Sequence, residues 1–381
     1  MESKRIAVIM EGRVGYERNV LLGIRDFATR QPDWIVRLEF PSRSIGRFLA
    51  DWNPDGVLFQ WVNLPPSAVR TITSLPGPVI HVSDTRGRLK VPCVGLDNAV
   101  IGKMAATYLL DRGCRNFAFV GLKDVGFSHS RQQAFADRVK REGHTPKAFL
   151  LPNSASTLDR SVEGRLRHWL NDLPKPTALF AVHDECSLRL VTLCRDEGIR
   201  VPEDIAILGS DDDALICELA GPKLSSIAVP ARQVGSLAAE RLAEFMSRKT
   251  RRNQRATLLA PTGVIARQST DVNQTEDATV NRVLRFIAAE FHRRLNVEDL
   301  LRETGVSRRA LERLFRLHVG RSPLQELHRR RIEYACNLLK SGNDPLHQIA
   351  QRCGFRDASQ FVSVFGRQIG ETPGKYRSGN S

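Results

Sequence analysis

The sequence lacks the features that mark secreted, membrane-bound and disulfide-linked proteins. No stretch approaches the roughly 18 consecutive apolar residues of a membrane-spanning helix. The N-terminus, Met1 to Met10, contains one short apolar run and no apolar segment of the signal-peptide kind. The seven cysteines are scattered and include no CxxC pair, which argues against disulfides and against a zinc site. We therefore expect a soluble, cytoplasmic protein with reduced thiols and no bound metal.

The motifs of common enzyme classes are absent as well. The sequence contains no GxGxxG, GxxxxGK[ST], HExxH or GxSxG, the signatures of dinucleotide, nucleotide, zinc-peptidase and serine-hydrolase sites. A thiol-based enzyme needs an activated cysteine, but Cys93 is followed by Val-Gly-Leu, with no neighbouring His or Arg. We therefore expect no catalytic site and no cofactor.

Positive charge is concentrated towards the C-terminus. The chain has 381 residues, too many for one ordinary core, and a formal charge of +15. The segment from Val280 to Ser381 contains 19 Lys and Arg against 10 Asp and Glu, whereas the other 279 residues contain 38 against 32. A basic domain favours a polyanionic partner, because neutralised phosphates supply most of the non-specific affinity. An inert basic surface is the alternative.

Residues 5–270 alternate between short apolar runs and segments of helical spacing. We expect strands at Ile6–Met10, Ile35–Phe40, Gly56–Phe59, Pro78–Val82, Asn116–Val120, Phe149–Leu151, Ala178–Val182 and Ile205–Leu208. Helices are expected at Val20–Thr29, Gly102–Leu110, Ser130–Glu142, Cys186–Glu197 and Val234–Met246. This alternation predicts an α/β fold of two doubly wound lobes, with parallel sheets covered by helices on both faces. Ligands of such folds bind beyond the carboxyl ends of the strands.

A polar segment without periodicity, Asp271–Thr279, is predicted to be a linker to an all-α domain. The helix Val280–His292 has one apolar stripe, and Asn296 and Ser307 are suited to cap the two helices that follow. A long helix, Pro323–Leu339, has its proline at the permitted first turn. The expected organisation is an α/β domain, a linker and an all-α domain at residues 1–270, 271–279 and 280–381.

One pattern occurs twice in the last hundred residues. The first copy comprises Leu300–Leu301, Gly305-Val306-Ser307, Leu311, Phe315, Gly320 and Pro323. The second comprises Ile349–Ala350, Gly354-Phe355, Phe361, Phe365, Gly370 and Pro373. Each copy predicts a short helix, a glycine-containing turn and a second helix, which is the helix-turn-helix signature. Two copies predict that one chain reads two adjacent major grooves.

The second helix of each copy has a polar face that suits DNA. In the helix Arg308–Val319 this face carries Arg308, Arg309, Glu312, Arg313 and Arg316, opposite Leu311, Leu314 and Phe315. In the helix that starts at Asp357 it carries Ala358, Ser359, Gln360, Ser363 and Arg367, opposite Phe361, Val364 and Phe365. Arg pairs bidentately with guanine and Gln with adenine, whereas Arg near a helix end binds phosphate. A solvated helix face is the alternative for each of these residues.

These copies belong to a longer signature. It reads Arg331-Ile332-x-x-Ala335-x-x-Leu338-Leu339, Ile349-Ala350-x-x-x-Gly354-Phe355-x-Asp357-x-Ser359-x-Phe361-x-x-x-Phe365 and Gly370-x-Thr372-Pro373-x-x-Tyr376-Arg377. The segment 280–378 thereby resembles the DNA-binding domain of the AraC family. The resemblance implies two recognition helices held about one DNA turn apart by the connecting helix. The second recognition helix departs from it in its small side chains, which favours a role in positioning.

An acidic run, Asp211-Asp212-Asp213, follows the expected strand Ile205–Leu208. Such carboxylates bind a metal or accept hydrogen bonds from sugar hydroxyls, and a helix N-cap is the alternative for two of them. The surrounding sequence resembles the effector domain of the LacI/GalR family at Pro92-x-Val94-x-x-Asp97-Asn98, Pro202–Asp212, Leu224–Ile227 and Arg267-x-Ser269-Thr270. The resemblance implies a periplasmic-binding-protein-like domain, with two lobes joined by three crossovers and a sugar in the cleft.

The LacI/GalR resemblance also implies which residues hold the sugar. They are Arg131, His183, Asp184 and Asp211. Asp accepts hydrogen bonds from vicinal hydroxyls and Arg donates a fork of them. His183 stands where the family usually has Asn. On the facing lobe the loop Glu11–Tyr16 is expected to supply contacts, and Tyr16 and Trp61 either stack on the sugar or belong to the core.

A LacI-like sensor before an AraC-like reader resembles the bacterial xylose-operon regulators. The chain starts directly in its first strand, so we expect the C-terminal domain to read the DNA. We predict a homodimeric, sugar-controlled activator of pentose-use genes that binds D-xylose and half-sites in double-stranded DNA, with RNA polymerase as a further partner. The alternatives are a repressor, another monosaccharide, a sugar-transport protein, and an enzyme fused to a DNA reader, such as an alkyl-transferring repair protein.

Overall fold

The computed structural model describes residues 3–62, 64–83, 91–152, 160–247, 256–271, 277–341 and 344–378. The chain divides into two compact units, Met1–Thr270 and Asp271–Ser381. Most of the predicted linker, Asp271–Thr279, lies outside the described residues. Its last residues belong to helix α10 (Ala278–Glu290), which Asp277 caps by accepting hydrogen bonds from the N–H groups of Thr279 and Val280.

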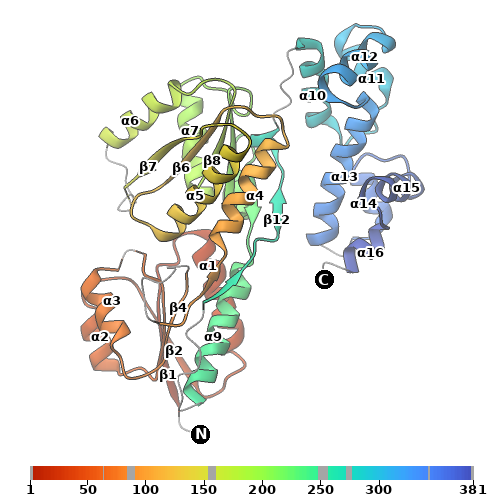
Figure 1. The fold of residues 1–381 in the computed structure, drawn as a ribbon. Coiled ribbons are helices and arrows are strands. Elements are labelled where there is room, and N and C mark those ends of the chain that lie inside the picture. The colour runs from red at the N-terminus through yellow and green to blue at the C-terminus, as the bar shows by residue number, and fades with distance from the viewer. Residues whose placement is uncertain are drawn as a thin grey trace. The chain divides into compact units, whose positions relative to one another are not determined.

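The first lobe of the N-terminal unit is a parallel sheet in the order β2-β1-β3-β4. Its elements are β1 (Lys4–Ile9), α1 (Gly15–Ala28), β2 (Trp34–Glu39), α2 (Ile45–Trp52), β3 (Gly56–Phe59), α3 (Pro66–Thr73), β4 (Val79–His81) and, from later in the chain, α9 (Ala231–Ser247). Alternate residues of β1 face opposite sides of the sheet. Ile6 and Val8 join the core beneath α1 and α9, while Ala7 and Ile9 join the core beneath α2 and α3 (Figure 1).

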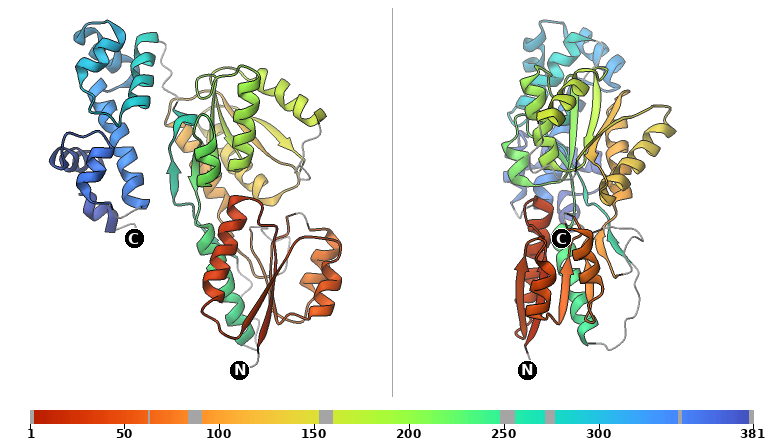
Figure 2. Two further views of the ribbon diagram at one scale, coloured as in Figure 1. Left: turned by 180° about the vertical axis from the view of Figure 1, so that it is seen from behind. Right: turned by 90° about the vertical axis from the view of Figure 1, so that its left-hand side faces the viewer.

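The second lobe is a larger sheet in the order β12-β10-β9-β8-β6-β7, parallel except for β12. Its elements are α4 (Asn98–Leu110), β6 (Phe117–Leu122), α5 (Gly126–Arg141), β7 (Lys147–Leu151), α6 (Arg160–Asn171), β8 (Thr177–Ala181), α7 (Asp184–Asp196), β9 (Ile205–Asp211), α8 (Ala214–Leu219), β10 (Ser225–Ala228), β12 (Gly263–Ile265) and the 3-10 helix η1 (Gln268–Thr270). Helices α4 and α5 cover one face, and α6 and α7 cover the other (Figure 2). Every residue of β8 is buried, as expected for a strand covered on both sides.

The chain passes between the lobes at three places. It leaves the first lobe through β5 (Val94–Leu96), returns after β10 to α9, and leaves again through β11 (Thr257–Leu259) towards β12. Strands β5 and β11 pair with each other as a separate parallel ribbon. Two doubly wound lobes with these connections confirm the predicted fold class of this unit.

The C-terminal unit is helical. Besides α10 it contains α11 (Val297–Thr304), α12 (Arg308–Val319), α13 (Pro323–Ser341), α14 (Leu346–Arg352), α15 (Ala358–Ile369) and α16 (Pro373–Ser378). Its apolar residues form two separate clusters. One is built from α10, α11 and α12 with Leu327, and the other from the rest of α13 with α14 and α15. The doubled helix-turn-helix pattern therefore corresponds to two small cores that share the long helix α13.

The predicted helix starts and turns are in place. The Asn296 side chain accepts a hydrogen bond from Asp299 N–H and the Asp299 side chain accepts one from Asn296 N–H, which caps α11. Ser307 caps α12 by accepting from Ala310 N–H. The turn glycines, Gly305 and Gly354, have φ of +69° and +75°, a region that favours glycine over residues with a Cβ.

The described residues contain no disulfide, no metal-binding group and no membrane-spanning helix. None of the seven cysteines, which all lie in the described ranges, forms a disulfide; Cys114 and Cys336 are half-buried and the others are buried. No group of three or more His, Cys, Asp or Glu in the described ranges is placed to hold a metal ion. None of the helices in those ranges combines the length and the apolar character needed to cross a membrane.

Candidate functional site

A cavity of about 350 Å³ lies between the two lobes of the N-terminal unit. It opens at the carboxyl ends of the strands, because its walls come from the residues that end or follow β1, β3, β4, β6, β8 and β9. Four of the five predicted ligand contacts are among the lining residues: Tyr16, Arg131, His183 and Asp211. The structure thus brings together residues that are far apart in the sequence.

Arg131 and Asp211 form the polar centre of the cavity. Arg131 is only 3% exposed and donates from Nε to Asn98 Oδ1 at 2.9 Å and from one terminal nitrogen to the carbonyl of Val182. Its other terminal nitrogen lies 3.6 Å from Asp211 Oδ1. The ring of Phe127 lies 5.3 Å from the guanidinium carbon. These contacts fix the guanidinium plane before any ligand binds, so its remaining donor is pre-oriented.

The carboxyl of Asp211 sits in an unfavourable place for a charge. Burial raises the pKa of Asp211 to about 6, although the positive charge of Arg131 acts to lower it. Asp211 and its neighbour Asp212 have φ of +109° and +51°, where residues other than glycine are strained. A strained, poorly solvated carboxyl next to a cavity is typical of a binding site.

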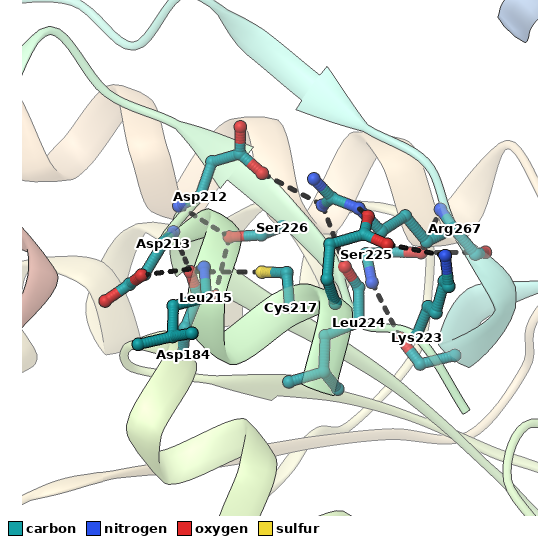
Figure 3. A network of polar contacts seen from close by, with 12 residues as sticks. Asp184, Asp212, Asp213, Leu215, Cys217, Lys223, Leu224, Ser225, Ser226 and Arg267 are labelled. Atoms are coloured by element: carbon teal, nitrogen blue, oxygen red, sulfur yellow. Dashed lines mark hydrogen bonds and ion pairs between the residues drawn. The ribbon is translucent and has the colours of Figure 1, made fainter. Parts of the chain in front are cut away.

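Asp184 does not line the cavity, so the prediction that it contacts the ligand is not supported by its position. Its Oδ1 accepts from Ser226 Oγ at 2.6 Å, and its Oδ2 accepts from Asp213 N–H at 2.8 Å (Figure 3). The side chain lies against β9, where a Cβ on Gly209 would come within 2.2 Å of Asp184 Oδ1. Asp184 therefore holds the turn that follows Asp211, and both carboxylate oxygens are engaged in doing so.

The other two aspartates of the acidic run have structural partners. Asp213 caps α8 by accepting from Leu215 N–H, and it pairs with Arg18 of the first lobe at 2.5 Å. Asp212 pairs with Arg267 at 2.9 Å (Figure 3). The helix-cap interpretation thus holds for Asp213, and Asp211 is the member of the run that faces the cavity.

His183 caps helix α7 with its ring. Its Nδ1 accepts a hydrogen bond from Cys186 N–H at 3.1 Å. The same nitrogen lies 3.2 Å from Glu185 Oε2. Asn is a favoured N-cap residue, so the ring supplies at this position the same capping contact that an Asn would.

The first lobe contributes the loop after β1, as predicted. Glu11, Arg13, Val14 and Tyr16 line the cavity. The buried side chain of Glu17 accepts from Arg13 N–H at 2.9 Å and holds this loop, and burial raises the pKa of Glu17. Trp61 is not among the lining residues; it packs against the core beneath α2 and α3, which fits the core interpretation for this aromatic.

Several residues that line the cavity were not predicted from the sequence. They include Gln60, Ser83, Asn98 and Phe127. Gln60 and Ser83 each follow an apolar run that was recognised as a strand, so their position beyond its carboxyl end was a usable signal. Asn98 ends the LacI/GalR-like stretch at Pro92–Asn98, and its buried side chain holds Arg131. Phe127 had no comparable signal.

The recognition helix of the first motif, α12, presents the predicted basic face. Arg309, Arg313 and Arg316 are exposed, and no described acidic residue forms an ion pair with them. Arg308 lies 3.4 Å from the half-buried Glu312. Leu311 and Phe315 are buried beneath this face, and Leu314 is partly buried.

The recognition helix of the second motif, α15, uses part of its polar face for itself. Gln360 Oε1 accepts from Arg356 N–H at 2.9 Å, while Gln360 N–H donates to Asp357 Oδ1 at 2.8 Å. These two hydrogen bonds close the first turn of α15, so Gln360 has a structural role without DNA. The exposed residues Ser359, Ser363 and Arg367 complete the face, with Arg367 reaching Ser363 Oγ at 3.3 Å.

Comparisons with known proteins extend along the whole chain. The periplasmic binding protein-like domain family matches residues 106–270, and the helix-turn-helix domain family matches residues 300–379. The xylose operon regulatory protein of Escherichia coli K12 is 28% identical over 99% of this chain and 97% of that protein. The protein of the same name from Haemophilus influenzae is 26% identical over 98% of both chains.

A solved structure is similar over the same extent. The structure of a xylose-binding transcription activator covers 100% of this chain and 99% of its own, with a TM-score of 0.67 and 26% identity. These relatives are regulators of transcription. In this chain the two-lobed domain comes first and the doubled helix-turn-helix motif follows it. The chain is therefore a DNA-binding transcription regulator, in which two helix-turn-helix motifs follow a periplasmic-binding-protein-like domain.

Proposed function

We propose that this regulator is controlled by a monosaccharide and that D-xylose is its effector. The observation that carries the proposal is the buried Arg131–Asp211 pair at the centre of the cavity. A fixed guanidinium and a carboxylate side by side offer a donor and an acceptor to neighbouring hydroxyl groups. The relatives that match the whole chain are named for xylose, and the solved one binds it.

Each lining group has a proposed role. Asp211 accepts from ring hydroxyls, the free donors of Arg131 bind sugar oxygens, and His183 Nε2 binds a sugar hydroxyl. Tyr16 covers the apolar face of the ring, since an aromatic ring packs well against its C–H groups. The cavity volume of about 350 Å³ falls in the usual range for small-ligand sites. The chain acts by binding alone, in the cytoplasm.

The proposed mechanism is a shift of population between open and closed lobes. The lobes touch beside the cavity: Arg18 pairs with Asp213 at 2.5 Å, and Gly15 N–H donates to Glu185 Oε1 at 3.1 Å. A sugar held by both lobes favours the arrangement in which these contacts are made. Closure then changes the dimer or the placing of the DNA-binding domains on repeated half-sites, and the bound protein activates pentose-use genes by recruiting RNA polymerase.

A homodimer is part of the proposal, and strand β2 supports it. This strand lies at the edge of the first sheet and pairs only with β1 among the described strands. Three of its apolar side chains are exposed: Ile35 at 51%, Val36 at 41% and Leu38 at 42%. An exposed apolar edge strand suits pairing with the same strand of a second copy across a twofold axis.

A thermal-shift screen tests the effector. The unfolding midpoint is measured with xylose, arabinose, ribose, glucose and fucose, and we expect the largest rise with xylose, growing with the logarithm of its concentration. Asp211→Asn should abolish the rise. The matched control is Asp212→Asn, which removes the charge of the neighbouring residue, outside the cavity. This variant should keep the rise of the midpoint with xylose. No rise with any sugar, or a full rise in Asp211→Asn, would refute the assigned site.

A further inference from the structure

The two DNA-reading motifs share one helix but have separate cores. The first core contains the apolar stripe of α10, and the second contains Phe355 and Phe361. Helix α13 passes through both. A single shared helix leaves the second core free to tilt and twist about its axis unless other contacts hold it. The structure contains such contacts at the residues that follow α10, Phe291 to Leu295, which are called the α10 turn below.

Arg331 binds the α10 turn from the middle of α13. Its Nε donates to the carbonyl of Phe291 at 3.0 Å, and one terminal nitrogen donates to the carbonyls of Arg293 at 2.8 Å and Leu295 at 3.4 Å. The carbonyls at a helix end lack partners within the helix, so a buried cation is well suited to them. Burial lowers the pKa of Arg331 to about 10, which leaves it charged at neutral pH.

The same guanidinium also contacts the second motif. Its central carbon lies 5.5 Å from the ring centroid of Phe355, the residue that follows the turn glycine of the second motif. Arg331 is only 3% exposed. One buried side chain thus touches the α10 turn, which follows a helix of the first core, and the turn of the second motif.

Gly354 makes the second link, and the first motif offers a direct comparison. A Cβ on Gly354 would lie 2.5 Å from the carbonyl oxygens of both Phe291 and Arg293, which belong to the α10 turn. A Cβ on Gly305, the equivalent glycine of the first motif, would meet no atom within 4 Å. Both glycines have nearly the same left-handed backbone, so they differ in this close approach and not in φ.

We infer that Arg331 and Gly354 are positioning residues for DNA recognition, which hold the second motif against the α10 turn and so set the distance between the two DNA sub-sites. The inference rests on the proposed reading of DNA by both motifs. Two readers joined rigidly at one distance gain affinity from simultaneous binding, and this gain falls when their separation is no longer fixed.

Selection from a pool of DNA duplexes with a random central region tests the inference on the full chain. We expect the wild-type chain to enrich two short motifs at a single spacing. Gly354→Ala and Arg331→Met should enrich the same two motifs over a broader range of spacings. They should also bind the duplex of wild-type spacing about tenfold or more weakly, because the two binding events no longer support each other.

The control is Gly305→Ala, which introduces the same left-handed strain without a steric conflict and should keep the single spacing. Arg331→Lys keeps the charge but loses the planar fork, so it should broaden the spacing as well. Thermal unfolding establishes whether each variant is folded. If Arg331→Met does not fold, Arg331→Lys and Gly354→Ala test the inference in its place. An unchanged spacing in the folded variants, or equal broadening in Gly305→Ala, would overturn the inference. A single enriched motif with the wild-type chain would overturn the two-motif reading, and this inference with it.

Discussion

Asp184 and Asp211 lie close together in the sensor but differ in what holds them. Asp184 accepts from Ser226 Oγ and Asp213 N–H, whereas Asp211 is set beside Arg131 at the cavity. Removing Asp184 leaves buried donors without acceptors, and removing Asp211 relieves a buried charge. The same residue type therefore stabilises the fold at one position and is available for binding at the other.

Alanine variants should separate these two roles. Asp184→Ala should lower the free energy of unfolding by about 2 kcal/mol or more, since each unsatisfied buried donor costs about 1–3 kcal/mol. Asp211→Ala should change it by less than about 1 kcal/mol and abolish the response to xylose. Urea unfolding at neutral pH, with and without the sugar, measures both quantities. Equal losses of stability in the two variants would contradict this assignment.

The raised pKa of Asp211 predicts a pH dependence. Its folded-state value of about 6 lies above the ordinary value of 3.8, so between these values the folded chain holds a proton that the unfolded chain has released. The stability contributed by this group is therefore present at low pH and is lost as the pH rises through this window. In the proposed site the ionised carboxylate is the acceptor for xylose, so the affinity should fall below about pH 6, by about tenfold one unit lower.

Calorimetric titration with xylose between about pH 5 and pH 8 measures this effect. Asp211→Asn should bind the sugar weakly and without this dependence, because it has no carboxyl to titrate. A wild-type affinity that stays constant over the whole range would rule out the ionised Asp211 carboxylate as the acceptor for the sugar.

At the scale of elements, the strands that are buried on both faces are the ones that the sequence predicts well. The strands β1, β3, β8 and β9 are apolar because both faces of their sheets are covered, and their positions were predicted to within a few residues. Strand β10 was missed because it begins with Ser225 and Ser226. These hydroxyls are buried yet satisfied, since Ser225 Oγ donates to Arg267 O and Ser226 Oγ to Asp184 Oδ1. A periodicity of apolar residues cannot detect a strand stabilised in this way.

The recognition helix α12 yields a prediction about two arginines on the same exposed face. Arg313 lies near its middle and Arg316 nearer its C-terminal end. We expect Arg313→Ala to relax the preference at one base position, at a cost of about 1–3 kcal/mol for the favoured base. Arg316→Ala should weaken binding to all sequences alike, as loss of a phosphate contact does.

Binding of a panel of duplexes with single base changes, at several salt concentrations, distinguishes the two arginines. The slope of affinity against salt should decrease for Arg316→Ala, because one phosphate contact is lost. A uniform loss in both variants would mean that Arg313 also contacts phosphate.

At the scale of the whole molecule, the cavity and the DNA-reading helices belong to different units, and their coupling is the regulatory property. If xylose changes the affinity for an operator duplex by some factor, the duplex must change the affinity for xylose by the same factor. We expect a factor of about 5 to 150, the usual range for such coupling.

Two titrations check this reciprocity, one of operator against protein saturated with xylose and one of xylose against protein saturated with operator. The variant Asp211→Asn should bind operator with one affinity whether or not the sugar is present. Xylose binding that leaves operator affinity unchanged would refute the proposed coupling, although each domain would keep its own ligand.

Relations between elements were the part that the sequence did not predict. The two helix-turn-helix copies have the same glycine at the turn, and the pattern gives no reason to treat Gly305 and Gly354 differently. Only the folded chain shows that one glycine faces open space and the other touches the α10 turn. Asp184 was assigned to the ligand for the same reason: its place after β8 is visible in the sequence, but the direction of its side chain is not.

The hydrogen bonds of Gln360 have a consequence for the promoters that such a regulator controls. The amide oxygen that would read an adenine is used within the first turn of α15, and the serines beside it are short. We expect base pairs beneath the second motif to be under weaker selection than those beneath the first. More base changes should be tolerated there than beneath the arginines of α12. An alignment of promoters recognised by this protein should therefore show two motifs, of which the one beneath α12 is the better conserved.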